Sequence, residues 1–128
     1  MFKVLIVEDH ASFRESLVRV LQSKFEDILI SEAEDGSSVL SKVEADEPDL
    51  ILMDVGLPGV NGITLTRKIK KNRPHIRVAV LTNYDSAEYK EAAYQAGADY
   101  FLSKSTTGPG DIAAVVEAVM GGGEESED

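Results

Sequence analysis

The chain has 128 residues, of which 43% are hydrophobic and 28% charged, with a formal net charge of −10 and no cysteine. This length suits one domain. The lack of cysteine excludes disulfides and thiolate metal sites, and no apolar run approaches the ~20 residues that span a membrane. The acidic charge opposes binding to nucleic acid. Because the first residues also lack a secretory-signal pattern, we expect a cytoplasmic domain that contacts neither DNA nor membrane.

The first half of the chain predicts two strand–helix units. The nearly continuous apolar run at 2–7 is typical of a buried strand, and the following segment places four apolar residues on one helical face: Phe13, Leu17, Val20 and Leu21. A second strand is expected at 28–30. A turn at 35–36 then precedes a short amphipathic helix marked by Val39, Leu40 and Val43.

The middle of the chain predicts two further units. A third strand at 49–54 leads through the Gly- and Pro-rich loop 56–62 into a helix that stops before Pro74. A fourth strand is expected at 76–82. The helix after it has Ser86 as its N-cap and ends at Ala96-Gly97, where glycine permits a left-handed conformation.

The last unit completes a pattern of five alternating strands and helices. A strand at 100–103 precedes a helix, opened by 108–111, whose apolar stripe consists of Ile112, Val115, Val116 and Val119. The alternation indicates an α/β domain with a parallel sheet over residues 1–121. The Gly-rich acidic segment 122–128 cannot bury enough apolar area to order itself and is expected to be a disordered tail or linker.

Polar side chains stand where four of the five predicted strands end. Glu8 and Asp9 follow the first strand, Asp54 ends the third, Thr82 ends the fourth and Lys104 follows the fifth. Singly, each is more often a cap, a turn residue or a solvated lysine. Together they lie at the carboxyl edge of a parallel sheet, where such folds place function. The set supplies a nucleophile, a cation site, a phosphate hydrogen-bond donor and a phosphate counterion, and its oxygen ligands suit Mg²⁺.

Four segments resemble the response regulator receiver domains of two-component systems. They are VEDH at 7–10, DVGLPGVNG at 54–62, LT at 81–82 and AGADYFLSK at 96–104. The resemblance covers about residues 2–120 and implies a flavodoxin-like three-layer (βα)5 sandwich whose parallel five-stranded sheet has the order 2-1-3-4-5.

The resemblance implies that Asp54 accepts a phosphoryl group from the phosphohistidine of a sensor histidine kinase or phosphotransfer protein. Glu8 and Asp9 would hold Mg²⁺ together with Asp54 and the backbone carbonyl of Gly56. Such a domain is not an enzyme in the ordinary sense, because it catalyses only its own phosphotransfer and dephosphorylation.

Three other residues receive roles from the same resemblance. Lys104 would pair with one phosphoryl oxygen and Thr82 would donate a hydrogen bond to another. Phe101 would change rotamer and report phosphorylation to the last helix, strand and loop, although a plain core role is equally compatible with the sequence. The domain would then alter its partner-binding surface.

A narrower resemblance connects the chain with receivers of LuxR/NarL-type transcription regulators. It is carried by Asp9-His10, Phe13-Arg14, LPGVNGI at 57–63 and a non-proline after Lys104. Regulation of transcription through an output domain is therefore expected, and only the acidic tail follows Met120. The sequence leaves open a receiver excised from a longer regulator or one that acts alone, and whether phosphorylation drives homodimerisation.

Several residues near the predicted site depart from the common family pattern. Ser105 stands where many relatives have proline, so a cis peptide is not expected there. Asn83 replaces a small residue, and neither Tyr84 nor Gly56 offers a group that positions an attacking water. These side chains predict slow autodephosphorylation, while His10 is close enough to the acids to tune them.

Three other functions compete with that of a phosphorylated receiver. A haloacid dehalogenase-type phosphatase carries Asp-x-Asp after its first strand, whereas Asp54 is followed by Val55-Gly56 after the third. A nucleotide-binding loop is disfavoured by the absence of G-x-x-x-x-G-K-[ST] and by the spacing of the glycines at 56, 59 and 62. The alternative that remains is a receiver-like module that binds proteins without phosphate.

Overall fold

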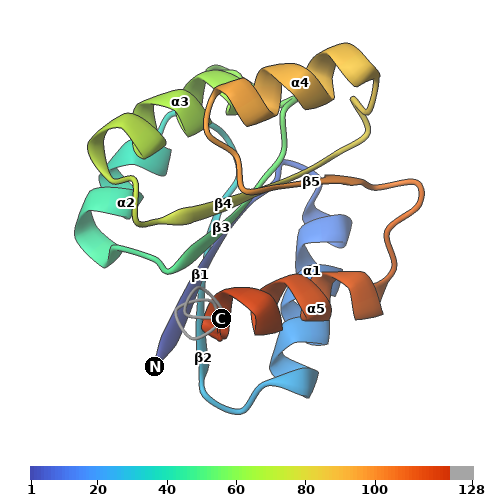
Figure 1. The fold of residues 1–128 in the computed structure, drawn as a ribbon. Helices are drawn as coiled ribbons and strands as arrows, with labels where there is room; N and C mark the ends of the chain where they lie inside the picture. The colour runs from blue at the N-terminus through green and yellow to red at the C-terminus, as the bar shows by residue number, and fades with distance from the viewer. Residues whose placement is uncertain (122–128) are drawn as a thin grey trace.

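The computed structural model describes residues 1–121, whose central element is a parallel sheet of five strands between two layers of helices (Figure 1). The strand order is β2-β1-β3-β4-β5, which confirms the predicted fold class. The predicted tail at 122–128 lies outside the described residues. The strands are β1 (Phe2–Val7), β2 (Ile28–Ala33), β3 (Leu50–Met53), β4 (Arg77–Thr82) and β5 (Tyr100–Ser103). The helices are α1 (Ala11–Lys24), α2 (Val39–Asp46), α3 (Gly62–Asn72), α4 (Ala87–Gln95) and α5 (Pro109–Met120).

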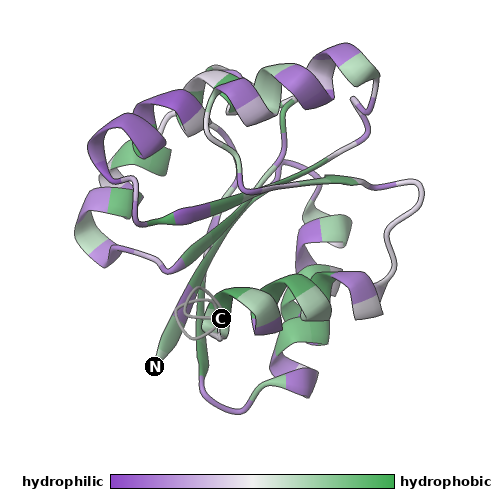
Figure 2. Cartoon of the chain, in the orientation of Figure 1, coloured by the Kyte–Doolittle hydropathy of each residue, from purple (hydrophilic) through white to green (hydrophobic). Residues whose placement is uncertain are grey.

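The two faces of the sheet carry separate hydrophobic cores, because successive side chains of a strand point to opposite faces. Leu5 and Val7 belong to the core shared with α2, α3 and α4, whereas Val4 and Ile6 belong to the core shared with α1 and α5. β3 is buried along its whole length. The strands and inner helix faces are hydrophobic and the outer face of α3 is hydrophilic (Figure 2), as expected of a sheet covered on both sides.

β2 is longer than the sequence indicated. It was expected at 28–30, but it continues to Ala33 and pairs with β1 in the register Leu5↔Ser31, Ile6↔Glu32 and Val7↔Ala33. This part of the strand contains the polar residues Ser31 and Glu32, so it has no apolar run that would predict a strand. An edge strand tolerates such polar side chains. By contrast, β3 is one residue shorter at each end than expected and β4 begins one residue later, at Arg77.

Local signals in the sequence correctly located both ends of α4. Ser86 caps α4 by accepting a hydrogen bond from the Tyr89 amide at 3.3 Å, and Gly97 adopts the expected positive φ of 107°. No cis peptide occurs in residues 1–121, as expected at Ser105. None of the helices in this range is both long and apolar enough to traverse a bilayer.

Candidate functional site

Backbone pairing carries three of the predicted site residues to one edge of the sheet. The Glu8 amide donates to the Ala33 carbonyl at 3.0 Å, and the Asp54 amide donates to the Val7 carbonyl at 3.1 Å. Each bond extends a strand ladder by one residue, since Val7 pairs with both Ala33 and Met53. On the other side of the site, the Lys104 amide donates to the Thr82 carbonyl at 3.0 Å. The sheet register therefore fixes the positions of the backbone atoms that carry these side chains.

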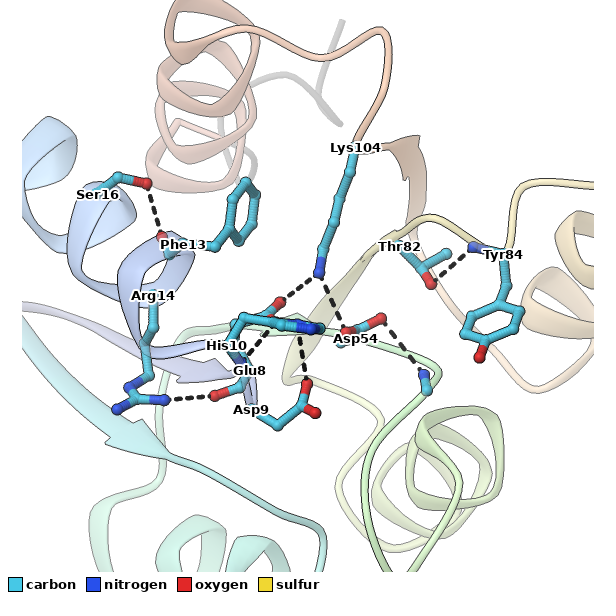
Figure 3. A network of polar contacts seen from close by, with 11 residues as sticks. Glu8, Asp9, His10, Phe13, Arg14, Ser16, Asp54, Thr82, Tyr84 and Lys104 are labelled. Carbon is cyan, nitrogen blue, oxygen red and sulfur yellow. Dashed lines mark hydrogen bonds and ion pairs between the residues drawn. The ribbon is translucent and has the colours of Figure 1, made fainter.

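The ammonium group of Lys104 lies between two buried carboxylates (Figure 3). Its Nζ is 2.7 Å from Glu8 Oε1 and 3.2 Å from Asp54 Oδ2, and the lysine side chain is only 9% exposed. Burial acts to lower the pKa of Lys104, but the hydrogen bond that its ammonium group donates to Glu8 and the negative charges of Asp54 and Glu8 outweigh it and raise the pKa above the ordinary lysine value. Lys104 is therefore fully charged at neutral pH.

A cluster of possible cation ligands lies beside this lysine. Each of Glu8, Asp9, His10 and Asp54 offers one ligand atom, and these atoms lie within 4.8 Å of one another. Asp9 Oδ1 is buried and accepts no hydrogen bond from residues 1–121, although His10 Nδ1 lies 3.4 Å away. A buried carboxylate oxygen without a hydrogen-bond donor is costly unless it is paired. The donor set therefore fits a hard divalent cation, which takes carboxylate oxygens as ligands.

His10 contacts the acids more closely than the sequence indicated. Its Nδ1 lies 3.0 Å from Glu8 Oε2, which also accepts a hydrogen bond from the His10 amide at 3.1 Å. The ring itself is 68% exposed. The imidazole thus covers the solvent side of the acid cluster and does not belong to the core.

The loop after Asp54 is packed tightly against the site. A Cβ atom at Gly62 would overlap the Asp54 carbonyl oxygen, and the Gly62 amide donates to the Val55 carbonyl at 3.0 Å. A Cβ atom at Gly56 would overlap the ring of Tyr84. The Gly56 amide also donates to Asp54 Oδ1 at 3.3 Å. Two glycines therefore allow the loop and Tyr84 to close over the edge of the site.

Thr82 and Phe101 occupy different surroundings. Thr82 is fully buried at the end of β4, and its Oγ1 accepts a hydrogen bond from the Tyr84 amide at 3.1 Å. The hydroxyl proton can still be donated to another group. Phe101 is partly buried and packs against the core on the side of α2, α3 and α4. The structure does not place it in the polar cluster, so both readings of Phe101 given by the sequence remain open.

Two residues of α1 contact the site although the sequence gave them no role there. Lys104 Nζ lies 4.6 Å from the centre of the Phe13 ring, and Arg14 Nη1 donates to the Glu8 carbonyl at 2.7 Å (Figure 3). Arg14 Nε also donates to Glu32 Oε1 at 2.9 Å. The only signal was the pair Phe13-Arg14 itself, which contributed to the narrower resemblance. Their contacts depend on how the first turn of α1 faces the sheet.

The fold and the site together define a class of protein. A doubly wound sheet of order 2-1-3-4-5 defines a flavodoxin-like α/β protein. Its three acids and a lysine gather at the carboxyl edge of the sheet, at the topological switch point. The sequence model for the response regulator receiver domain matches residues 4–117. This chain belongs to that family, whose function is a phosphorylation switch in two-component systems.

Individual relatives agree with this assignment. The transcriptional regulatory protein DegU of Brevibacillus brevis is 34% identical over 94% of this chain and 51% of its own length. Among solved structures, a CheY-like receiver domain protein from Methanospirillum hungatei JF-1 has a TM-score of 0.89, 28% identity and 98% coverage of both chains. The receiver domain of the putative response regulator NarL from Mycobacterium tuberculosis has a TM-score of 0.83 and 30% identity, covering 94% of this chain and 97% of that one. The expected resemblance to LuxR/NarL-type receivers is confirmed.

This chain spans about half the length of the curated relatives it matches.

Proposed function

We propose that this chain works as a phosphorylation switch in which Asp54 is the phosphoacceptor. The observation that carries the proposal is the position of Lys104, whose ammonium group contacts Asp54 Oδ2 and Glu8 Oε1 inside a nearly buried site. A lysine held there can move its ammonium group towards the added negative charge when the Asp54 carboxylate becomes an acyl phosphate. Each charge-assisted hydrogen bond contributes about 1.5–3 kcal/mol.

The proposed transfer uses a phosphohistidine donor on a sensor kinase or phosphotransfer protein. A carboxylate oxygen of Asp54 forms a bond to phosphorus while the bond between phosphorus and the donor imidazole nitrogen breaks, and the released imidazole takes up a proton. Lys104 and the Thr82 hydroxyl bind oxygens of the transferred group. In this proposal the domain catalyses only its own phosphorylation and dephosphorylation.

The cation in this proposal is Mg²⁺, held by Glu8, Asp9 and Asp54 with the Gly56 carbonyl. Bound Mg²⁺ neutralises charge on a transferring phosphoryl group. The support comes from the ligand atoms of Glu8, Asp9 and Asp54, which lie within 4.8 Å of one another, and from the buried Asp9 oxygen that accepts no hydrogen bond from the described residues.

The output of the switch is also part of the proposal. Phosphate bound at Thr82 would act through the neighbouring β4–α4 loop, while Phe101 in β5 adjusts to the change. Since relatives about twice as long are named as transcriptional regulators, we place the domain upstream of an output domain that controls transcription. Its proposed working compartment is the cytoplasm, which is typical of the receiver family.

The test is the intact mass of the protein after incubation with phosphoramidate or acetyl phosphate, with and without Mg²⁺. A gain of about 80 Da, the mass of one phosphoryl group, is expected only with Mg²⁺ present and Asp54 intact. Asp54→Asn should abolish the gain. Asp27→Asn is the matched control, because Asp27 is an exposed aspartate that precedes β2, at the opposite edge of the sheet.

A gain that persists in Asp54→Asn would move the phosphoacceptor elsewhere. No gain under any condition would favour the alternative, a receiver-like module that binds proteins without phosphate.

A further inference from the structure

The immediate surroundings of the Lys104 ammonium group include an aromatic ring as well as carboxylates. The ammonium has three N–H donors, and the carboxylates of Glu8 and Asp54 account for two of them at 2.7 and 3.2 Å. Nζ lies 4.6 Å from the centre of the Phe13 ring. This distance is within the range of about 6 Å at which a cation over an aromatic face is attracted by the ring quadrupole.

The hydrophobic core holds the Phe13 ring in place. Phe13 lies in the first turn of α1 and packs against the core that contains Leu17, Leu81 and Ile112. The Lys104 side chain is only 9% exposed, so its ammonium group approaches the ring with little water around it. A cation–π contact strengthens when it is desolvated. The ring can therefore restrain the lysine more firmly than a surface aromatic residue would.

The main chain around Lys104 restrains the lysine side chain less than the Phe13 ring does. Its amide is bonded to the Thr82 carbonyl at 3.0 Å, but the next residue is Ser105, which lacks the fixed φ of proline. The long lysine side chain loses considerable rotamer entropy when it is held in one geometry. Any contact that orients it before the phosphoryl group arrives reduces that cost during the transfer.

We propose that Phe13 is a positioning residue for phosphotransfer: its ring holds the Lys104 ammonium group beside Asp54 through a cation–π contact. This inference rests on the proposed function of Lys104. The contact is broad and weakly directional, so the ammonium group can move from Glu8 towards a phosphoryl oxygen without leaving the ring. Phe13 touches neither phosphate nor metal in this role and acts only through the lysine.

The first measurement is independent of phosphorylation. Protons bound to the carbon next to Lys104 Nζ should show an upfield ring-current shift in the NMR spectrum of the wild type. The shift should vanish in Phe13→Leu and persist in Phe13→Tyr, which keeps the ring. A wild-type spectrum without the shift, or an unchanged shift in Phe13→Leu, would overturn the inference whatever the fate of Asp54.

The second measurement is the rate constant of phosphorylation by phosphoramidate, followed by intact mass in saturating Mg²⁺. Phe13→Leu keeps an apolar side chain of similar size and should lower the rate constant about threefold to tenfold, as loss of a partly desolvated cation–π contact predicts. Phe13→Tyr should restore it to within about twofold. Equal rates in the wild type and Phe13→Leu would contradict the positioning role.

A double-mutant cycle separates positioning from simple packing. In a Lys104→Met background, Phe13→Leu should cause no further loss of rate, because the group that the ring positions is gone. An equal loss in both backgrounds would show that Phe13 only supports the fold and would overturn the proposal. If the wild type takes up no phosphate while the ring-current shift is present, the proposed function fails and the kinetic role of Phe13 fails with it.

Discussion

Lys104 is the residue whose charge decides the electrostatics of the site. Its raised pKa reflects the hydrogen bond to Glu8 and the charges of Asp54 and Glu8, which outweigh the cost of burial. A folded-state pKa above the unfolded value means that the stabilisation is fully present below the unfolded pKa and is lost as pH rises through the folded pKa. The affected window therefore begins near pH 10.5 and extends upward.

Lys104→Gln tests this linkage because it keeps a hydrogen-bond donor and removes the charge. At pH 8 in EDTA, we expect the variant to be less stable than the wild type by about 1.5–3 kcal/mol, the value of hydrogen bonds to charged groups. Urea denaturation at pH 8, 9, 10 and 11 should show a constant difference up to pH 10 and a smaller one at pH 11. A difference that stays constant at pH 11 would mean that the charge of Lys104 does not stabilise the fold.

Tyr84 lies beside the loop that follows Asp54, where its ring would meet a Cβ atom at Gly56. Its ring packs over Gly56 and lies 5.4 Å, between ring centres, from Tyr89. The expected slow autodephosphorylation gains a steric reason from this packing. Tyr84→Ala should open the rim and shorten the lifetime of the acyl phosphate about threefold or more, which corresponds to a modest change in barrier.

The lifetime is measured by intact mass after the phosphodonor is removed. Tyr89→Ala serves as a control, since it removes a neighbouring ring that does not overlie Gly56. A wild-type half-life of seconds at room temperature would refute slow autodephosphorylation, and an unchanged lifetime in Tyr84→Ala would exclude the ring as its cause.

Individual residues also show how much of the site could be predicted from the sequence. Glu8, Asp54 and Lys104 were found because each follows a strand, and strand ladders carry their first atoms to one edge. The contacts of Phe13 and Arg14 were not predicted. Helical periodicity placed Phe13 on the inward face of α1, but it does not specify which polar groups at the edge of the sheet lie beside the first turn of that helix.

At the scale of elements, α4 and α3 differ in how firmly the core holds them. α3 buries five residues: Gly62, Ile63, Leu65, Thr66 and Ile69. Within the described part of the chain, α4 buries only Ala93 and leaves Tyr89 and Tyr94 well exposed. Few buried apolar contacts define the parts of a protein that open most easily. α4 is therefore expected to be displaced from the core more readily than α3.

Hydrogen exchange should reveal this difference directly. We expect backbone amides of α4 to exchange at least about tenfold faster than those of α3 in the unphosphorylated protein, as a lower local opening free energy requires. Ala93→Gly should widen the gap by removing the one fully buried side chain. Equal protection of the two helices would indicate that α4 opens only with global unfolding.

The elements also show why boundaries were predicted unevenly. β1 and β5 were predicted with their observed bounds because apolar residues fill them. The sequence predicted β2 only as far as Ile30, because the part that pairs with Leu5 and Ile6 contains the polar residues Ser31 and Glu32. Tertiary pairing made these polar residues a strand, and such pairing outweighs local preference.

At the scale of the whole molecule, the carboxylates of Glu8, Asp9 and Asp54 repel one another at one edge of the sheet, and the proposed Mg²⁺ would relieve that repulsion. Because Mg²⁺ would bind only the folded state, a concentration ten times its dissociation constant would stabilise the protein by about 1.4 kcal/mol. For a domain of this size, the midpoint of thermal unfolding should rise by about 4–8 °C. EDTA should remove the gain, and KCl at equal ionic strength should not reproduce it.

Asp9→Asn is expected to affect the melting temperature differently in EDTA and in Mg²⁺. Asp9 Oδ1 accepts no hydrogen bond from residues 1–121, so the amide costs few contacts and removes one charge from the cluster. In EDTA the variant should therefore melt at or above the wild-type temperature, yet Mg²⁺ should no longer raise that temperature. If Asp9→Asn lowered the melting temperature in EDTA and kept the full response to Mg²⁺, Asp9 would be a structural residue and the cation would bind elsewhere.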